Sequence, residues 1–186
     1  GLGVFDVLSR LASDGKTKGS ASASPFLIKW PNDVMGLDQN SQGSYRKLCG
    51  ILCEMSKGWL LAGIGINLRK TAYPDSLKDS ATSLEEVLDE RNAPPGLPMI
   101  ESESLAQKIA EAILLRIGDA GWKDDYQKHM WMLEKDVSFI VGHPIQGNRE
   151  HGTVLGIDDT GRLLLRKEGG EINAFFSGEI SNVRDL

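Results

Sequence analysis

The sequence predicts an α+β fold followed by a small β-barrel. Helical and strand-like patterns both occur before residue 134. After Val137 only short β-like runs remain, separated by turns at about every ten residues, a spacing that is typical of a small barrel. We therefore predict two domains, residues 1–134 and residues 135–186.

The composition excludes several classes of protein. The chain has 186 residues, 40% of them hydrophobic and 25% charged, which is typical of a soluble globular protein. Its net charge of −5 argues against a nucleic-acid-binding surface, which would be basic. No apolar run approaches the ~20 residues of a membrane span. No signal peptide is visible.

The two cysteines, Cys49 and Cys53, are predicted to be reduced and half-buried. Both belong to one strand-like run, in which four residues span roughly 13 Å. That separation exceeds the ~7 Å limit between the Cα atoms of a disulfide. Reduced cysteines are typical of a cytoplasmic protein. The three histidines are scattered along the chain, and the sequence identifies no metal ligands.

The first part of the chain begins with a helical pattern. Apolar residues recur at helical spacing over residues 3–13. The small, polar residues 16–24 predict a loop, and residues 26–30 and 34–37 predict strands. Two longer strands, expected on either side of Ser56-Lys57-Gly58, predict a hairpin. They cover residues 47–55 and 59–68.

Helical patterns return after the hairpin. Ser83 and Glu86 have the spacing of a capping box and predict the start of a short helix. Residues 91–99 predict a connector, and residues 102–117 an amphipathic helix. Another helix is marked by apolar residues at i, i+4 and i+8, namely Trp122, Tyr126 and Met130. The strands of the second domain are expected in the runs VSFIVG, GTVLGI, RLLLR and INAFF, with turns at 158–161 and 169–170.

The strand at 59–68 has two different faces. One face is apolar, and the other carries Gly63, Gly65 and Asn67. Glycine inside a strand costs stability and often marks close approach of a ligand or of another backbone. Two interpretations stay open, a ligand surface and a bulge or tight packing against a helix. A dinucleotide-binding loop is not indicated, because the third glycine of that motif is missing.

The hairpin register predicts which residues share this glycine face. A three-residue loop without a bulge would pair Met55 with Trp59, Cys49 with Gly65 and Lys47 with Asn67. Directly opposite residues project to the same side, so Lys47 would stand over the glycines. A lysine in that position suits an anionic group. The alternative is a solvated lysine at the start of a strand.

The stretch Lys29-Trp30-Pro31-Asn32-Asp33 forms a rigid corner after a strand. Pro31 favours an extended Trp30 and fixes its own φ. Lys29, Asn32 and Asp33 supply a cation, an amide and a carboxylate, which suit a nucleotide and its metal ion. The alternative is a structural turn with a buried tryptophan.

Together these motifs resemble biotin protein ligases. The resemblance covers nearly the whole chain and implies a catalytic domain related to class II aminoacyl-tRNA synthetases, followed by an SH3-like barrel. It is carried, in order, by Lys-Trp-Pro-Asn-Asp-Val at 29–34, Lys-Leu-Cys-Gly-Ile-Leu at 47–52, Gly-Ile-Gly-Ile-Asn at 63–67, Thr-Ser-Leu at 82–84 and Phe-Phe-Ser-Gly-Glu-Ile-Ser-Asn-Val-Arg at 175–184.

The resemblance implies a reaction in two steps. Biotin and ATP, with Mg²⁺, give biotinyl-5′-adenylate and pyrophosphate, and the biotinyl group then passes to a lysine of a carrier protein such as a biotin carboxyl carrier domain. Lys47 matches the family's catalytic lysine. The implied binding residues are Gly63 and Gly65 for biotin, Asn67 for the adenylate, and Asn32, Asp33, Trp30 and Lys29 at the nucleotide.

The sequence departs from the family in one respect, because no Gly-Arg-Gly occurs in it. The family's Gly-Arg-rich loop folds over biotin and the phosphates. We therefore expect the chain to hold the second half of the catalytic domain and the C-terminal domain, and to have little activity alone. A non-catalytic paralogue or interaction module of the same fold, and a lipoate–protein ligase, are the alternatives. The Lys-Trp-Pro-Asn-Asp corner and the barrel favour biotin over lipoate, while the carrier and a homodimer are left open.

Overall fold

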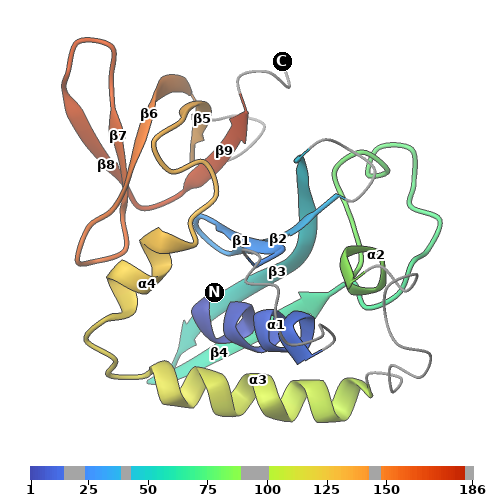
Figure 1. The fold of residues 1–186 in the computed structure, drawn as a ribbon. Coiled ribbons are helices and arrows are strands. Elements are labelled where there is room, and N and C mark those ends of the chain that lie inside the picture. Colours follow the sequence, from blue (N-terminus) through green and yellow to red (C-terminus); the bar gives the residue numbers. More distant parts are fainter. Residues whose placement is uncertain (15–23, 39–42, 89–100, 143–147, 183–186) are drawn as a thin grey trace. The chain divides into compact units, whose positions relative to one another are not determined.

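The computed structural model describes residues 1–14, 24–38, 43–88, 101–142 and 148–182 (Figure 1). Residues 16–23 of the loop predicted at 16–24, and the connector predicted at 91–99, lie outside these residues. Helices and strands follow one another in separate runs, as expected for an α+β fold. The contacts divide the chain into two units, which are described separately. Unit 1 consists of Gly1–Ile28 and Asn32–Asp119, and unit 2 of Lys29–Pro31 and Ala120–Leu186.

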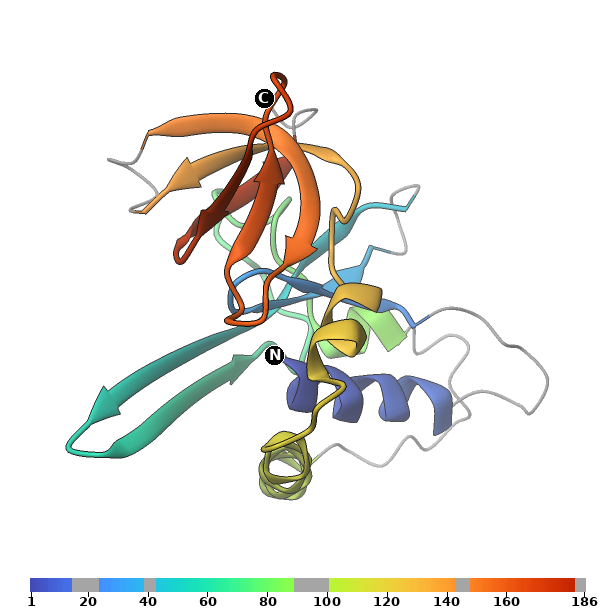
Figure 2. The same ribbon diagram turned by 90° about the vertical axis from the view of Figure 1, so that its left-hand side faces the viewer.

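Unit 1 is built on a four-stranded sheet in the order β1-β2-β3-β4. The β2–β3 and β3–β4 pairs are antiparallel. Strand β3 pairs with both neighbours near its middle, and Figure 2 shows β3 and β4 continuing as a long two-stranded ribbon. The strands are β1 (Phe26–Lys29), β2 (Asp33–Leu37), β3 (Tyr45–Ser56) and β4 (Trp59–Ile66).

Three helices complete unit 1 and agree with the helical patterns of the sequence. Helix α1 (Leu2–Asp14) packs against α3 (Ser102–Arg116), and the Arg116 guanidinium lies 2.8 Å from the Asp6 carboxylate. The short helix α2 (Leu84–Leu88) begins with the predicted capping box. The Ser83 hydroxyl accepts from the Glu86 N–H at 3.2 Å, and the Glu86 carboxylate accepts from the Ser83 N–H at 3.0 Å.

The predicted hairpin forms, but its predicted register is wrong by one residue. Ser56 pairs with Trp59, so the loop has two residues, Lys57 and Gly58, rather than three. Both have positive φ, +48° and +82°, which is the conformation of a two-residue turn that matches the strand twist. Consequently Cys49 pairs with Ile66, and Gly65 pairs with Gly50.

Unit 2 contains helix α4 (Trp122–Lys128) and a five-stranded sheet in the order β8-β7-β6-β5-β9. The expected strands are all present, and β9 is one that the sequence did not predict, because its residues include a single apolar side chain. No pairing between β8 and β9 closes the sheet among residues 148–182. The strands are β5 (Asp136–Val141), β6 (Arg149–Ile157), β7 (Leu163–Arg166), β8 (Ile172–Phe175) and β9 (Gly178–Asn182).

Alternating apolar residues of these strands form the core of unit 2. The fully buried apolar side chains include Val137, Phe139, Val154, Ile157, Leu163, Leu165 and Ile180. The predicted turn at 158–161 is confirmed, since the Asp158 carboxylate accepts from the Thr160 N–H at 2.9 Å and the Arg162 N–H at 3.0 Å. No helix in the described part of the chain is long and apolar enough to cross a membrane.

Candidate functional site

An ion pair between Asp33 and Lys47 is the centre of the candidate site in unit 1. The Lys47 Nζ lies 2.8 Å from the Asp33 Oδ1. The Asp33 side chain is 12% exposed, whereas that of Lys47 is 52% exposed. The carboxylate is therefore fixed in the structure, and the ammonium that it orients remains accessible to a ligand.

A β-bulge in β3 brings Lys47 to this face. Val34 pairs with Cys49 and Met35 pairs with Lys47, so Leu48 is an extra residue. In a regular strand, Lys47 and Gly50 would point to opposite faces, because they are three residues apart. The extra residue reverses that alternation and puts both on the face of Asp33. Lys47 therefore lies over a glycine, as predicted. The cause is the bulge in β3, and not the hairpin register that the sequence predicted.

The surface beside the ammonium lacks side chains on two neighbouring strands. Gly50 pairs directly with Gly65. A Cβ on Gly50 would lie only 3.3 Å from the Cε and the Nζ of Lys47, so the lysine lies across this glycine. Among the residues described, a Cβ on Gly65 would have one neighbour within 4 Å, the Gly50 carbonyl oxygen at 3.9 Å, so these residues leave the space above it open. We call Gly50 and Gly65 the glycine floor.

Gly50 is a site residue that the sequence analysis missed. The sequence does contain a signal, since Gly50 follows Lys47 at a spacing of three and precedes a run that pairs with a second glycine-bearing strand. That signal identifies Gly50 as a site residue only when the hairpin register and the bulge in β3 are known. Both depend on hydrogen bonds between strands that are distant in sequence.

Asn32 and Asn67 use their amides to hold the backbone around the site. The Asn32 Nδ2 donates to the Ile51 carbonyl at 2.7 Å, and the Ile51 N–H donates to the Asn32 carbonyl at 2.8 Å. The Asn67 Nδ2 donates to the Thr82 carbonyl at 3.0 Å. These bonds attach the corner before β2 and the segment before α2 to the centre of the sheet.

Cys49 lies in the core next to the ion pair. Burial, and to a smaller extent the nearby Asp33 carboxylate, raise the pKa of its thiol to about 11. The thiol therefore stays protonated at neutral pH and is a poor nucleophile. Both cysteines are free, as predicted, but Cys53 is exposed rather than half-buried.

The known proteins described below, to which the chain is similar, belong to one family. The family model "Biotin protein ligase C terminal domain" matches residues 142–182. A biotin–[acetyl-CoA-carboxylase] ligase of Mycobacterium tuberculosis is 30% identical over 84% of this chain and 53% of its own length. A mutant biotin protein ligase from Aquifex aeolicus in complex with biotin has a TM-score of 0.71 and 26% identity, over 97% of this chain and 67% of that chain.

The chain is related to the biotin protein ligases. A second structure, the Aquifex aeolicus ligase in complex with biotin and ATP, has a TM-score of 0.64 and 26% identity, over 97% of this chain and 70% of that one. The chain spans about half the length of the curated ligases that it matches.

Two other predicted site residues, Lys29 and Trp30, make their contacts within unit 2. The Trp30 indole N–H donates to the Gly161 carbonyl at 2.8 Å, and its ring lies 6.1 Å from that of Phe139. The Lys29 Nζ lies 3.1 Å from the Glu179 carboxylate. Trp30 is buried, as expected for a tryptophan in a structural turn. That Lys29 or Trp30 contacts a ligand stays a prediction.

Metal binding was left open by the sequence. Among the residues described, no group of three or more histidine, cysteine or acidic side chains could hold a metal ion. At the glycine floor the donor set is a single carboxylate, Asp33, already paired with Lys47. That set does not fit a resident metal, whereas it can share a magnesium ion with the phosphates of a bound nucleotide.

Proposed function

We propose that this chain carries the lysine-bearing part of an ATP-dependent biotin–protein ligase site. The observation that supports the proposal is the Asp33–Lys47 pair over the glycine floor, in a relative of biotin protein ligases. The substrates are biotin and ATP, and the acceptor is a lysine of a carboxylase carrier domain. A non-catalytic module of the same fold is the second candidate, supported by the open face above Gly65.

Lys47 acts in the first step, in which a biotin carboxylate oxygen attacks the α-phosphorus of ATP and pyrophosphate leaves. This step brings two anionic groups together. An ammonium held in place by a carboxylate 2.8 Å away offsets their repulsion as charge develops in the transition state. The exposed half of Lys47 lets the ammonium meet the ligand without losing Asp33.

The second step transfers the biotinyl group. The amine of the carrier lysine attacks the acyl carbon of biotinyl-5′-adenylate, a new amide bond forms and AMP leaves with the bonding electrons of the broken acyl–oxygen bond. Lys47 stands beside the leaving phosphate in this proposal. Its charge stabilises the departing anion in the same way as in the first step.

The remaining roles follow the resemblance and the geometry. Gly63 and Gly65 lie under the biotin, Asn67 lies next to the adenylate, and Asn32 and Asp33 lie at the nucleotide. Mg²⁺ enters with the ATP phosphates. In this proposal unit 1 belongs to a class II synthetase-like domain within residues 1–134, and residues 135–186 form an SH3-like domain. A cytoplasmic location and a homodimer stay predictions.

Binding of the reaction intermediate tests the proposal. Biotinyl-5′-adenylate titrated into the chain by calorimetry is expected to bind, and Lys47→Ala is expected to weaken it about tenfold, the effect of losing one charged contact. Lys108→Ala, which removes an exposed lysine of α3, is the matched control and leaves the affinity unchanged. Absence of binding by the unmodified chain contradicts the proposal.

A second measurement separates the proposed enzyme from its alternatives. The chain, loaded with biotinyl-5′-adenylate, is mixed with a biotin carboxyl carrier domain, and the mass of the carrier is followed. Gain of one biotinyl group on the carrier supports the ligase. Tight adenylate binding without transfer supports the non-catalytic module, and preference for lipoyl-5′-adenylate supports the lipoate alternative.

A further inference from the structure

We propose that Arg46 is a positioning residue for Lys47. Its guanidinium fastens the segment 77–82 to the start of β3, and that segment holds the backbone of Lys47 beside the bulge. The proposal rests on the proposed function only for the task of Lys47 at the reacting phosphate. The contacts that support it all lie within unit 1.

The backbone of Lys47 is held by the segment 77–82. The bulge at Leu48 interrupts the ladder between β2 and β3 directly beside Lys47. On the other edge of β3, the ladder with β4 ends before Lys47 is reached. There the Lys47 N–H donates to the Ser80 carbonyl at 2.8 Å, and the Lys47 carbonyl accepts from the Thr82 N–H at 2.9 Å. These two bonds orient the backbone from which the Lys47 side chain projects.

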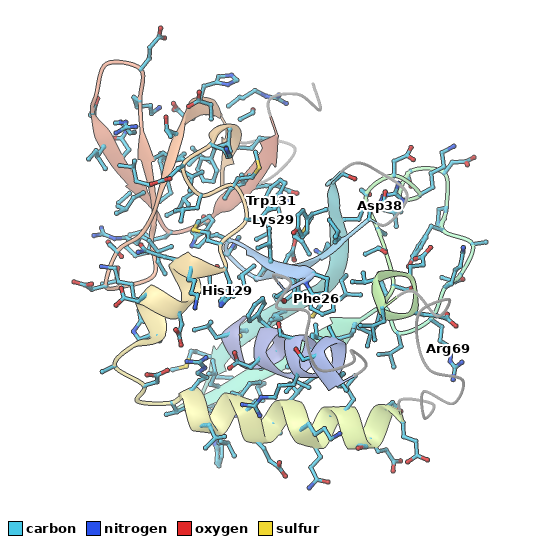
Figure 3. All side chains as sticks on the ribbon, in the orientation of Figure 1. Phe26, Lys29, Asp38, Arg69, His129 and Trp131 are labelled. Carbon is cyan, nitrogen blue, oxygen red and sulfur yellow. The ribbon has the colours of Figure 1, made fainter. Side chains whose placement is uncertain are left out.

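The Arg46 guanidinium joins the same segment to the end of β2. Its Nη1 donates to the Lys78 carbonyl at 3.1 Å, and its Nη2 lies 2.8 Å from the Asp38 Oδ2. Asp38 directly follows β2 (Figure 3), and its side chain is only 5% exposed. A carboxylate at that depth requires a cation, and a planar guanidinium can contact a carboxylate and a carbonyl at the same time.

Arg46 and Lys47 project to opposite faces of the sheet, because they are neighbours in a strand. Lys47 lies on the face of Asp33 and the glycine floor. Arg46 pairs with Gly36, the glycine over which Val87 of α2 packs. Arg46 is therefore directed away from the proposed ligand surface, and its effect on Lys47 passes through the backbone.

Hydrogen exchange of the isotope-labelled chain, followed residue by residue by NMR, tests the proposal without a ligand. Arg46→Met is expected to speed exchange of the Lys47 and Thr82 amides by about tenfold, because the segment 77–82 opens more easily. The Ile51 amide, which lies in the same strand and donates to the Asn32 carbonyl, is expected to keep its rate.

A charge-neutral variant separates this local effect from general destabilisation. Arg46→Met alone leaves the Asp38 carboxylate buried without its cation, which can destabilise the whole unit. The double variant Asp38→Asn with Arg46→Met removes both charges, and the same local rise in exchange is expected. Unchanged exchange of the Lys47 and Thr82 amides in the double variant overturns the proposal. An equal rise at Ile51 and in α3 overturns it as well.

Lys78→Met is the matched control. The Lys78 side chain is 59% exposed, and the change retains the main-chain carbonyl that accepts from Arg46. Exchange of the Lys47 and Thr82 amides is expected to stay as in the unmodified chain. A rise as large as that in Arg46→Met would show that the segment responds to any substitution, and it overturns the proposal.

Titration with biotinyl-5′-adenylate shows whether the effect on binding passes through Lys47. Arg46→Met is expected to weaken binding about threefold, a part of the effect of Lys47→Ala, because the ammonium is less well oriented. In a Lys47→Ala background the same change is expected to have no further effect. A further loss in that background overturns the proposal, since Arg46 would then act on the ligand by another route.

The conservative variant Arg46→Lys is expected to bind more tightly than Arg46→Met and less tightly than the unmodified chain. Its ammonium keeps a charge beside Asp38 but lacks the fork that also reaches the Lys78 carbonyl. If the unmodified chain binds no biotinyl-5′-adenylate, the proposed function fails, and the exchange experiment still decides whether Arg46 positions Lys47.

Discussion

At the scale of single residues, the site depends on the Lys47 ammonium, on the Asp33 carboxylate and on the glycine at position 50, which has no side chain. Lys47 lies across Gly50 with its ammonium on Asp33, and a Cβ at position 50 would lie 3.3 Å from the Cε and Nζ of the lysine, tighter than ordinary contact. The charge of Lys47 is therefore oriented by packing as well as by electrostatics.

Gly50→Ala tests this arrangement. The new Cβ would lie 3.3 Å from the Lys47 Nζ, closer than ordinary contact, so the ammonium must shift by a few tenths of an ångström from its position on Asp33. We expect Gly50→Ala to weaken biotinyl-5′-adenylate binding less than Lys47→Ala does, and the double variant to bind no more weakly than Lys47→Ala alone, because both changes act on the same lysine. Calorimetric titration measures this. Gly169→Ala, where no atom would lie within 4 Å of the new Cβ among the residues described, is the control; full additivity of the two changes would contradict the arrangement.

Cys49 makes the stability of the chain dependent on pH in the alkaline range. The folded state raises the pKa of its thiol from 9.0 to about 11, chiefly through burial. Between these values the unfolded chain has released the proton and the folded chain has kept it, so stability present below pH 9 is lost as pH rises toward 11. Urea unfolding at about pH 8.5 and about pH 10.5 is expected to show a smaller loss in Cys49→Ala than in the unmodified chain. Equal losses would show that the thiol does not titrate in this way.

At the scale of elements, the β3–β4 hairpin has two faces with different tasks. The glycine floor occupies one face, and the apolar residues Ala62, Ile64, Ile66 and Leu68 occupy the other. The apolar face and α3 line a groove of about 510 Å³. The glycines of β4, Gly63 and Gly65, thus lie on the face opposite the groove.

Gly65→Val tests the assignment of the faces. Valine suits a strand, and a Cβ at position 65 meets no atom of the described residues closer than 3.9 Å, so the fold should persist while the space for a ligand is filled. We expect an unchanged melting temperature and lost adenylate binding. Gly36→Ala is the opposite case, because its Cβ would lie 2.4 Å from the Val87 Cγ2 and should destabilise the protein. Unfolding by Gly65→Val would show that this glycine serves packing.

At the scale of the whole molecule, the ligand surface is open. Small-molecule sites commonly bury about 70–90% of the ligand. A Cβ on Gly65 would have no neighbour within 4 Å except the Gly50 carbonyl oxygen in the part of the chain that the structure describes. Large apolar side chains of the hairpin, among them Met55, Trp59 and Leu61, are exposed. A ligand on the glycine floor would be contacted from one side by the residues that the structure describes.

We therefore expect this chain alone to form little biotinyl-adenylate. Orientation of both reactants contributes strongly to such a reaction, and one open surface cannot enclose biotin and ATP together. Pyrophosphate release from biotin and MgATP measures the rate. A rate above about 0.01 s⁻¹, on the slow side of ordinary enzymes, would contradict this expectation. Lys47→Ala is the control for contaminating activity.

The elements whose pattern is local could be predicted from the sequence. Helical spacing located α1, α3 and α4, the Ser83–Glu86 capping box located the start of α2, and the alternation along residues 59–68 separated the two faces of β4. The motifs around Lys47 and Asn67 indicated the family. These features depend on residues that are neighbours along the chain, so the sequence alone determines them.

Only the tertiary structure decided which side chains meet. The two-residue turn changed the hairpin register, and the bulge at Leu48 restored Lys47 to the glycine face. The carboxylate of Asp33, and not Asn67, became the neighbour of Lys47, and Glu179 met Lys29 across 150 residues. Such pairings are set by hydrogen bonds and burial between distant segments, which no local pattern records.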